Sequence, residues 1–357
     1  MYCSRQGNEA MELRIGFLGF GNVARAFARI ISEREARIAD QFDLRLKTNA
    51  IATGAHGCIV SAEGFDLKQA LAAVERGEAL NTLPGAVDAV DTTGLVAMCD
   101  ADVLFETTPL NPIDGEPATE WIRKALLRRM SVVTANKGPI AFAHKELTTL
   151  AREVKCSFRF EATVMDGAPI FNMVESCLPA VRVTGLAGVL NSTTNYILTG
   201  MERGRLFEEC LTEARELGVA EANADYDIDG WDAAVKIVAL ANVLMNADAT
   251  PRSVERRGIR YITSKELKHA SDTGALIRLV ARAEMLPSGL KLAVGPEAVA
   301  ISSILGSARG TTNALILETD LMGELAVIET NPGVEQTAYA LLSDLIAIHR
   351  ELQLKKA

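Results

Sequence analysis

The sequence lacks features that would assign it to several classes of protein. No apolar run reaches about 18 residues, so we expect no membrane-spanning helix. The formal net charge is -9 and no basic run carries interleaved aromatic residues, which argues against a nucleic-acid-binding surface. The first eleven residues have no apolar signal core and contain Glu9, so we expect a frayed tail, a cytoplasmic protein, and a true start at either Met1 or Met11.

Cysteine motifs are also missing. The six cysteines are scattered, none forms a Cys-x-x-Cys pair, and no pair of histidines lies near them. This pattern is typical of a reducing compartment, where most cysteines behave as small apolar side chains. We therefore expect no metal–thiolate site.

The composition is that of a folded globular protein. Hydrophobic residues make up 48% of the chain and charged residues 23%, without low-complexity tracts. Because 357 residues exceed one compact core, we expect two domains.

The chain begins with a strand, a glycine turn and a helix. Residues 12–18 suit a buried strand and residues 25–31 show helical apolar spacing, with Gly19-Phe20-Gly21-Asn22-Val23-Ala24 between them. Glycines there let the backbone approach a pyrophosphate at the helix N-terminus. The segment predicts a dinucleotide site at Gly19, Gly21, Asn22 and Val23, and a plain tight turn is the alternative.

The side chain that would select between NAD and NADP is missing. A second strand, residues 47–53, ends at Gly54-Ala55-His56-Gly57. An acid there would bind the ribose 2′-hydroxyl of NAD, and a basic residue would accept the 2′-phosphate of NADP. The absence of an acid favours NADP, although His56 is more typical of a turn residue than of a cofactor contact.

Two later strands end on polar residues. The strand near 102–106 is followed by Thr107 and Thr108, and the strand near 131–133 is followed by Asn136 and Lys137. Ligands bind at the carboxyl ends of parallel strands, so these four residues are candidate cofactor contacts. A solvated turn lysine is the alternative for Lys137. Alternating strands and helices predict a Rossmann-type doubly wound parallel sheet in an α/β fold.

The second half has the pattern of an α+β domain. Strands are expected near 157–160, 182–190, 290–304, 314–319 and 326–329. Residues 191–195, with Thr193 among them, are preferred helix N-caps, and the same exposed N–H groups could hold an anionic part of a substrate. A terminal helix over 337–351 should return to the first domain. We place that domain at 1–150, completed by 331–357, and the second at 151–330.

The most distinctive stretch is residues 217–236. Five carboxylates and a lysine occupy residues 221–236, directly before an apolar run. If a helix starts near Gly230, Asp232 and Lys236 lie on one face. They could form a solvated ion pair beside capping acids. The apolar helix favours a charged pocket instead, because a buried lysine must be paired or shift its pKa.

Together these segments resemble homoserine dehydrogenase from about Arg14 to Ile348. The resemblance is carried by residues 19–23, 133–138, 161–164, 190–198, 220–221 and 229–236. It implies NAD(P)-dependent interconversion of L-homoserine and L-aspartate 4-semialdehyde, by a homodimer formed through the second domain.

The resemblance also assigns residues. Lys236 and Lys137 would handle the hydroxyl proton, a task that suits a desolvated lysine. The amino-acid substrate would be bound by Glu221, Asp227, Asp232 and Thr193. A monovalent cation such as Na+ would be held by hard oxygen ligands at Glu161, Val164, Asp166 and Ala168.

One segment departs from the family. Asn331-Pro332-Gly333-Val334-Glu335 replaces a glycine-rich loop, and the valine and the acid would crowd or repel a cofactor. The cofactor pose or the substrate could therefore differ. Two alternatives stay open: a paralogous dehydrogenase acting on another amino alcohol, and a catalytically silent nucleotide-binding sensor. Neither an ACT module nor a fused aspartokinase is expected in this chain.

Overall fold

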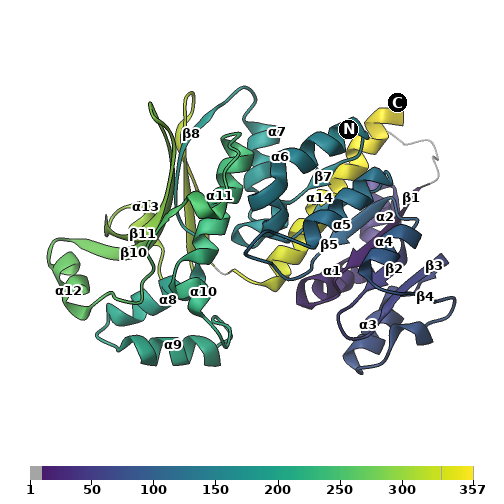
Figure 1. Ribbon diagram of the computed structural model, residues 1–357, viewed down its shortest axis with the longest axis horizontal. Helices are drawn as coiled ribbons and strands as arrows, with labels where there is room; N and C mark the ends of the chain where they lie inside the picture. The colour runs from purple at the N-terminus through teal and green to yellow at the C-terminus, as the bar shows by residue number, and fades with distance from the viewer. Residues whose placement is uncertain (1–9, 331, 357) are drawn as a thin grey trace. The chain divides into compact units, whose positions relative to one another are not determined.

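We describe the fold from a computed structural model, in which residues 10–330 and 332–356 are described. The chain divides into two compact units (Figure 1). The first comprises residues 10–136, 146–162 and 334–356, and the second comprises 137–145, 163–330 and 332–333. Residues 137–145 thus depart from the expected boundary at 150, because they pack with the second unit.

The first unit is built on a mainly parallel sheet with the strand order β4-β3-β2-β1-β5-β6-β7. The five strands from β2 to β7 in this order pair in parallel, whereas β3 and β4 extend the β2 edge in antiparallel fashion. The strands are β1 (Met11–Leu18), β2 (Leu44–Ala52), β3 (Cys58–Phe65), β4 (Val87–Ala89), β5 (Val103–Glu106), β6 (Ser131–Thr134) and β7 (Phe158–Arg159). The predicted α/β class and parallel sheet are confirmed, and the antiparallel edge was not foreseen.

Helices bury the faces of this sheet. They are α1 (Asn22–Glu33), α2 (Glu35–Phe42), α3 (Leu67–Glu75), α4 (Thr92–Met98), α5 (Ala118–Leu127) and α14 (Val334–Lys356), with the 3-10 turns η1 (Leu80–Thr82) and η2 (Glu161–Thr163). Helix α14 shares one apolar core with α1 and β1, to which it contributes Leu341, Leu345 and Ile348, all fully buried. The last segment of the chain therefore completes a core that the first segment begins.

The second unit is built on a mixed sheet with the order β13-β12-β8-β10-β11-β9. Its strands are antiparallel except for the β11–β9 pair: β8 (Val183–Val189), β9 (Glu255–Arg256), β10 (Ala275–Leu286), β11 (Gly289–Ala300), β12 (Asn313–Thr319) and β13 (Gly323–Glu329). Strand β10 was not expected, although it is central.

The helices of the second unit carry the site described below. They are α7 (Ile170–Cys177), α8 (Ser192–Met201), α9 (Phe207–Glu216), α10 (Asp225–Ile228), α11 (Trp231–Leu244), α12 (Ser264–Asp272) and α13 (Ile304–Ser307), with η3 (Met165–Gly167) and η4 (Pro251–Ser253). Both α8 and α11 pack against β10. Helix α6 (Lys137–Glu153) begins at Lys137 and is interrupted by a non-helical residue, Ala143. Its first part belongs to the second unit and its remainder to the first.

Candidate active site

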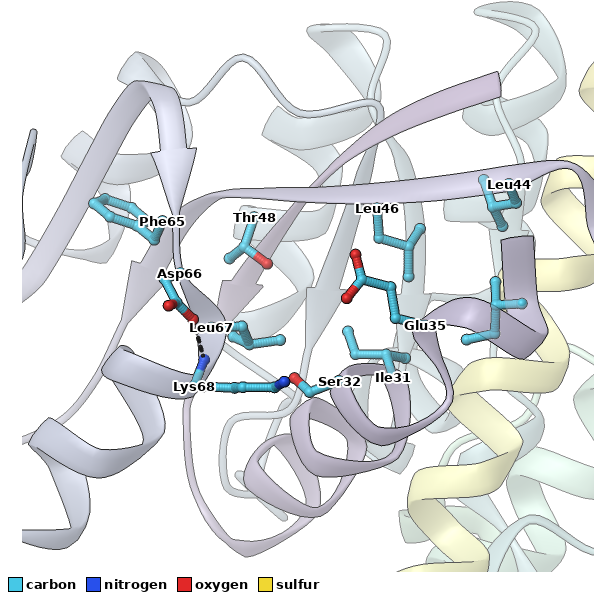
Figure 2. Close-up of a pocket in the computed structure, with 11 residues that line it drawn as sticks. Ile31, Ser32, Glu35, Leu44, Leu46, Thr48, Phe65, Asp66, Leu67 and Lys68 are labelled. Atoms are coloured by element: carbon cyan, nitrogen blue, oxygen red, sulfur yellow. Dashed lines mark hydrogen bonds between the residues drawn. The ribbon is translucent and has the colours of Figure 1, made fainter. Parts of the chain in front are cut away.

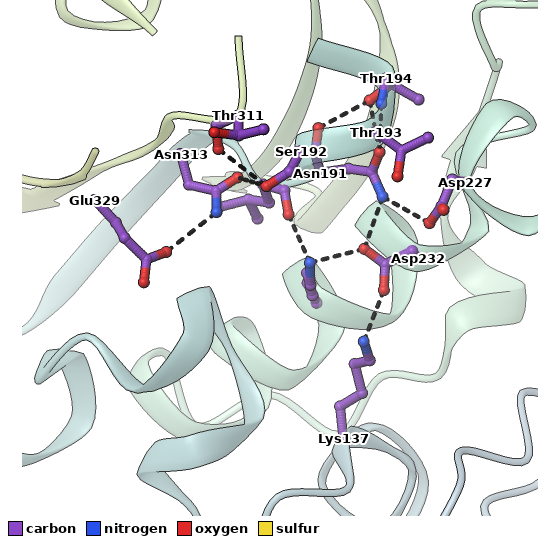
Figure 3. A network of polar contacts seen from close by, with 12 residues as sticks. Lys137, Asn191, Ser192, Thr193, Thr194, Asp227, Asp232, Thr311, Asn313 and Glu329 are labelled. Atoms are coloured by element: carbon purple, nitrogen blue, oxygen red, sulfur yellow. Dashed lines mark hydrogen bonds and ion pairs between the residues drawn. The ribbon is translucent and has the colours of Figure 1, made fainter. Parts of the chain in front are cut away.

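A buried carboxylate bridges two lysines in the second unit (Figure 3). Asp232 lies in the first turn of α11, and its Oδ1 accepts a hydrogen bond from Lys137 Nζ at 2.7 Å. Its Oδ2 lies 2.8 Å from Lys236 Nζ, one helical turn further along α11. The side chain of Asp232 is only 9% exposed, and those of Lys236 and Lys137 are 15% and 23% exposed. These three side chains therefore form a charged cluster that is largely withdrawn from solvent, and not a solvated surface pair.

Electrostatics hold this triad in its ionised form. Burial alone raises the pKa of Asp232, but the ammonium groups of Lys137 and Lys236 outweigh burial and hold that pKa below its usual range. Burial alone lowers the pKa of Lys236, but Asp232, helped by Asp166 and Asp227, outweighs it and raises that pKa. At neutral pH Lys236 is therefore an ammonium group aligned by a carboxylate.

The segment 190–193 connects the parts of this site. The carbonyl oxygen of Leu190 accepts a hydrogen bond from Lys236 Nζ at 2.7 Å. The side-chain amide of Asn191 donates to Asp227 Oδ1 at 2.7 Å and to Asp232 Oδ2 at 3.0 Å. Asn191 is also the N-cap of α8, because its Oδ1 accepts from the backbone N–H of Thr194. The capping interpretation is confirmed, and the cap residue additionally orients two site acids.

The two other predicted substrate acids have different surroundings. Asp227, on α10, is half-buried beside Asp232, and burial followed by that neighbouring charge raises its pKa. Glu221 is exposed and makes no hydrogen bond or ion pair with any other described residue. The hydroxyl of Thr193 donates to the carbonyl oxygen of Val219 at 2.9 Å, which ties the acidic loop to α8. Asp227 thus joins the lysine site, whereas Glu221 does not.

In the first unit, the glycine turn has the form needed for a dinucleotide phosphate. Gly19 has a φ of 84°, and a Cβ atom there would lie 2.9 Å from the backbone of Thr107. Gly21 caps α1 without a side-chain hydrogen bond, no acid stands in the first helical turn, and a Cβ at Gly21 would meet nothing within 4 Å. The first N–H groups of α1 therefore receive no side-chain cap, and the turn fits a pyrophosphate.

A buried glutamate, Glu106, was not among the residues predicted from the sequence. It forms hydrogen bonds with the ends of two neighbouring strands. Glu106, the last residue of β5, is fully buried and accepts hydrogen bonds from Thr108 N at 2.8 Å and from Thr134 Oγ1 at 2.6 Å. Burial raises its pKa, and the hydrogen bonds oppose that rise. The N–H of Asn136 in turn donates to Thr134 Oγ1 at 2.9 Å. Glu106 therefore fixes two of the loops that carry predicted cofactor contacts.

The end of β2 agrees with the turn interpretation of His56. Thr53 closes this turn, because its hydroxyl donates to Gly57 O at 3.0 Å and accepts from the N–H of His56 at 2.6 Å. The ring Nδ1 of His56 lies 3.0 Å from the carbonyl oxygen of Glu78. His56 is thus engaged in the local structure of the turn.

Comparison with known proteins identifies the family. Residues 169–346 match the family model "Homoserine dehydrogenase". An NAD(+)-dependent homoserine dehydrogenase of Pseudomonas canavaninivorans is 35% identical over 97% of this chain and 98% of its own length. A homoserine dehydrogenase of Methanocaldococcus jannaschii is 37% identical over 93% of this chain and 97% of its own length. This chain belongs to the homoserine dehydrogenase family.

Solved structures of this family share the fold. A homoserine dehydrogenase of Thiobacillus denitrificans superposes with a TM-score of 0.82 at 26% identity, covering 96% of this chain and 74% of its own. One of Thermoplasma acidophilum gives a TM-score of 0.78 at 25% identity, covering 97% of this chain and 100% of its own. As a member of the homoserine dehydrogenase family, the protein is an oxidoreductase that acts on a CH–OH group.

The residues that the family resemblance predicts for a cation lie around η3. Val164, Asp166 and Ala168 belong to the second unit, and Glu161 to the first. The carbonyl oxygens of Val164 and Ala168 each accept one backbone hydrogen bond, which leaves each a second lone pair for a hard cation. Asp166 has a φ of 43°. Burial raises the pKa of its carboxyl group, and the positive charges of Lys236 and Lys137 oppose that rise. The described residues contain no group of three or more His, Cys, Asp or Glu side chains that could hold a metal.

Three further features stand apart from this site. A cavity of about 350 Å³ in the first unit is lined by residues of α1, α2, β2, β3 and the start of α3, with Lys68 and Glu35 among them, and by none of the predicted site residues (Figure 2). The cysteines of the described ranges, Cys58, Cys99, Cys156, Cys177 and Cys210, are free thiols, and Cys3 lies outside those ranges. No helix within the described residues is long and apolar enough to cross a membrane.

Proposed function

We propose that this chain interconverts L-homoserine and L-aspartate 4-semialdehyde, with Lys236 and Lys137 as the acid–base pair. The observation that carries the assignment is the buried Lys137–Asp232–Lys236 triad. Alcohol oxidation releases the hydroxyl proton to a base, and aldehyde reduction requires the same proton from an acid. A lysine ammonium aligned by a carboxylate can deliver that proton, and the amine that remains can take it back.

The surrounding residues give the two lysines their separate tasks. Lys236 is held on two sides, by Asp232 and by the Leu190 carbonyl, so its position is fixed. Lys137 has a single hydrogen-bonding partner among the described side chains, Asp232, and is the more exposed of the two. We assign proton transfer to Lys236 and polarisation of the substrate oxygen to Lys137. Asp227 and Thr193 orient the substrate or its loop, and Glu221 remains a predicted contact of the amino acid.

Bound NAD(P) would accept or supply the hydride in this reaction. Its pyrophosphate would be held at the start of α1 by Gly19, Gly21, Asn22 and Val23. Further contacts to the cofactor would come from Thr107, Thr108 and Asn136, at the carboxyl ends of two parallel strands. The absence of an acid at the end of β2 favours NADP, whereas the similarity to the NAD(+)-dependent enzyme of Pseudomonas canavaninivorans favours NAD. Comparing kcat/KM for the two cofactors decides the preference.

Two finer assignments belong to the same proposal. A monovalent cation would be held by Glu161, Val164, Asp166 and Ala168, which predicts that activity in Na+ exceeds activity in a large organic cation at equal ionic strength. A homodimer would form through the second unit, and light scattering of the purified protein tests that assembly. A cytoplasmic location likewise remains a prediction.

The Lys236→Ala variant tests the assigned acid–base role. We expect kcat for L-homoserine oxidation to fall by about a hundredfold to ten-thousandfold, because the transferred proton loses its acceptor. Cofactor binding, followed by nicotinamide fluorescence, should persist. Lys145→Ala is the matched control, because Lys145 is a solvent-exposed lysine of α6 whose ion pair, to the exposed acid Asp248, lies outside the site. Undiminished turnover in Lys236→Ala would refute the role.

The wild-type assay also separates the two alternatives. Reduction of NAD or NADP with L-homoserine supports the proposed reaction. Turnover confined to other amino alcohols would indicate a paralogous dehydrogenase. Cofactor binding without turnover of any alcohol would indicate a sensor.

A further inference from the structure

A third carboxylate, Glu329, belongs to the polar network that contains Asp232 and Asp227. It is the last residue of β13 and lies directly opposite Asn313 of β12 in the antiparallel register. The amide of Asn313 donates to Glu329 Oε2 at 3.1 Å. The amide oxygen of the same side chain, Asn313 Oδ1, accepts a hydrogen bond from Ser192 Oγ at 3.4 Å, and Ser192 follows Asn191 in the chain (Figure 3). Glu329 is thus joined through α8 to the residues that hold Asp232.

Glu329 differs from Asp232 in having no cationic partner among the described residues. Both oxygens of Asp232 face lysines, whereas within the described ranges Glu329 accepts a hydrogen bond only at Oε2, from the neutral amide of Asn313. The Glu329 side chain is nevertheless partly withdrawn from solvent. A partly buried carboxylate without a counter-charge is costly, so a ligand that brings a cation gains from meeting it.

The pKa of Glu329 is consistent with the lack of a cationic partner. Burial is the largest cause that raises the pKa of Glu329, to about 7, and the carboxylate of Asp166 adds to the rise. Lys236 opposes it, but without a hydrogen bond or ion pair to Glu329. The charged groups that act on Glu329 are therefore one acid on η3 and one lysine on α11, and the lysine is already held by Asp232 and Leu190.

We propose that Glu329 receives the α-ammonium group of the amino-acid substrate. The proposal rests on the proposed function, since that function supplies a substrate with an ammonium group. Asn313 then acts as a positioning residue, which holds one carboxylate oxygen and leaves the other to the ligand. The substrate's cation compensates the charge that the protein leaves unpaired, and Glu329 becomes a determinant of specificity for amino alcohols over simple alcohols.

The test compares L-homoserine with 4-hydroxybutanoate, which has the same hydroxyl and carboxylate but no amine. In Glu329→Gln we expect kcat/KM for L-homoserine to fall about tenfold or more, through KM, because a charge-assisted hydrogen bond is lost. The kcat/KM for 4-hydroxybutanoate, or its Ki as a competitive inhibitor, should change less than about twofold, within the usual scatter of a neutral substitution. An equal loss for both compounds, or no loss for either, would overturn the proposal.

Two controls keep this result interpretable. Glu324→Gln lies on the same strand at an exposed position and should leave both values unchanged. Glu329→Asp keeps the charge and should retain part of the preference for the amine, which also guards against a Gln variant that folds poorly. Wild-type turnover of L-homoserine tests the proposed function itself, so failure of that function and failure of the Glu329 assignment give different results.

Discussion

At the scale of single residues, the site depends on the pairing of charges inside a largely apolar helix. Lys236 and Asp232 are followed on α11 by Ile237, Val238 and Leu240, which are fully buried. A charge in such surroundings is stable only when an opposite charge lies beside it. Asp232 supplies that charge to two lysines at once, and this arrangement sets the protonation state in which the lysines meet a substrate.

The Asp232→Asn variant is therefore expected to shift the pH dependence of alcohol oxidation. In the proposed mechanism, oxidation needs the neutral amine of Lys236, so kcat/KM should rise with pH as this lysine loses its proton. Asp232 raises the pKa of Lys236 and burial lowers it, so removal of the carboxylate should lower that pKa. The midpoint of the pH–rate profile should then move to lower pH, together with a fall in maximal kcat.

The profile is measured from about pH 6 to 11, a range that includes the ordinary pKa of a lysine side chain. Asp248→Asn is the control, because Asp248 is an exposed acid paired with a lysine outside the site. A midpoint that stays in place in Asp232→Asn would mean that another group limits the profile.

Individual site residues were predictable to different degrees. Asp232 and Lys236 could be found because their four-residue spacing precedes an apolar helix, a local pattern that one face of a helix preserves. Glu106 and Glu329 could not be found, because each ends a short strand and its importance depends on partners 28 and 16 residues away. The exposure of Glu221 likewise depends on how its loop packs.

At the scale of elements, the two glycines of the turn between β1 and α1 have different roles, one in folding and the other in the proposed binding of the cofactor. Gly19 adopts a positive φ against the Thr107 backbone, so it is required by the fold. Gly21 has an ordinary φ and no near neighbour, so the fold would accept a side chain there. A side chain at Gly21 would, however, interfere with a phosphate bound at the start of α1, because the backbone must approach that phosphate closely.

Three alanine variants test this separation. Gly19→Ala should lower the free energy of unfolding by about 1–3 kcal/mol, because its φ is strained for alanine and its Cβ meets backbone. Gly21→Ala should unfold normally but bind NAD and NADP more weakly. Gly295→Ala, on β11 of the second unit, where an added Cβ would meet no heavy atom closer than 4.0 Å, should change neither property. Titrations with each cofactor and thermal melts give both readouts, and unweakened binding in Gly21→Ala would place the cofactor elsewhere.

Elements with strong local signals were predicted well, and edge elements were not. The sequence pattern predicted β1, α1, β6, β8 and the start of α11 close to their observed bounds, because each has a clear apolar period or a glycine boundary. Strands β3 and β4 are antiparallel additions at a sheet edge, where half-exposed residues give weak alternation. Helix α6 begins at Lys137, which the sequence left open as a turn residue, because the Gly138-Pro139 pair suits a first helical turn.

At the scale of the whole molecule, each unit has a core of its own and the chain enters the first unit more than once. The general division into a dinucleotide-type sheet and a second α+β sheet followed from the sequence. The exact boundary did not, because residues 137–145 are bound to the second unit by side-chain contacts such as those of Asn242 with the Ile140 and Ala141 carbonyls. Such long-range contacts leave no local pattern.

The separate cores predict separate responses to a core substitution, and the two tryptophans allow this to be measured. Trp121 lies on α5 in the first unit and Trp231 on α11 in the second. Leu341→Ala removes a fully buried side chain of α14 from the first core and should cost about 2–5 kcal/mol there. In a Trp231→Phe background, urea unfolding seen by Trp121 should move to lower concentration. In a Trp121→Phe background, the transition seen by Trp231 should move less.

The matched control is Leu354→Ala on the same helix, at a side chain that is 79% exposed and should leave both transitions in place. Equal displacement of the two transitions by Leu341→Ala would show that the units unfold as one cooperative body, despite their separate cores. A larger displacement of the transition seen by Trp121 would instead mean that α14 stabilises mainly the first unit. We propose that this unit binds the nicotinamide cofactor, so a saturating cofactor should then restore the Trp121 transition more than the Trp231 transition, because binding to the folded state alone stabilises it.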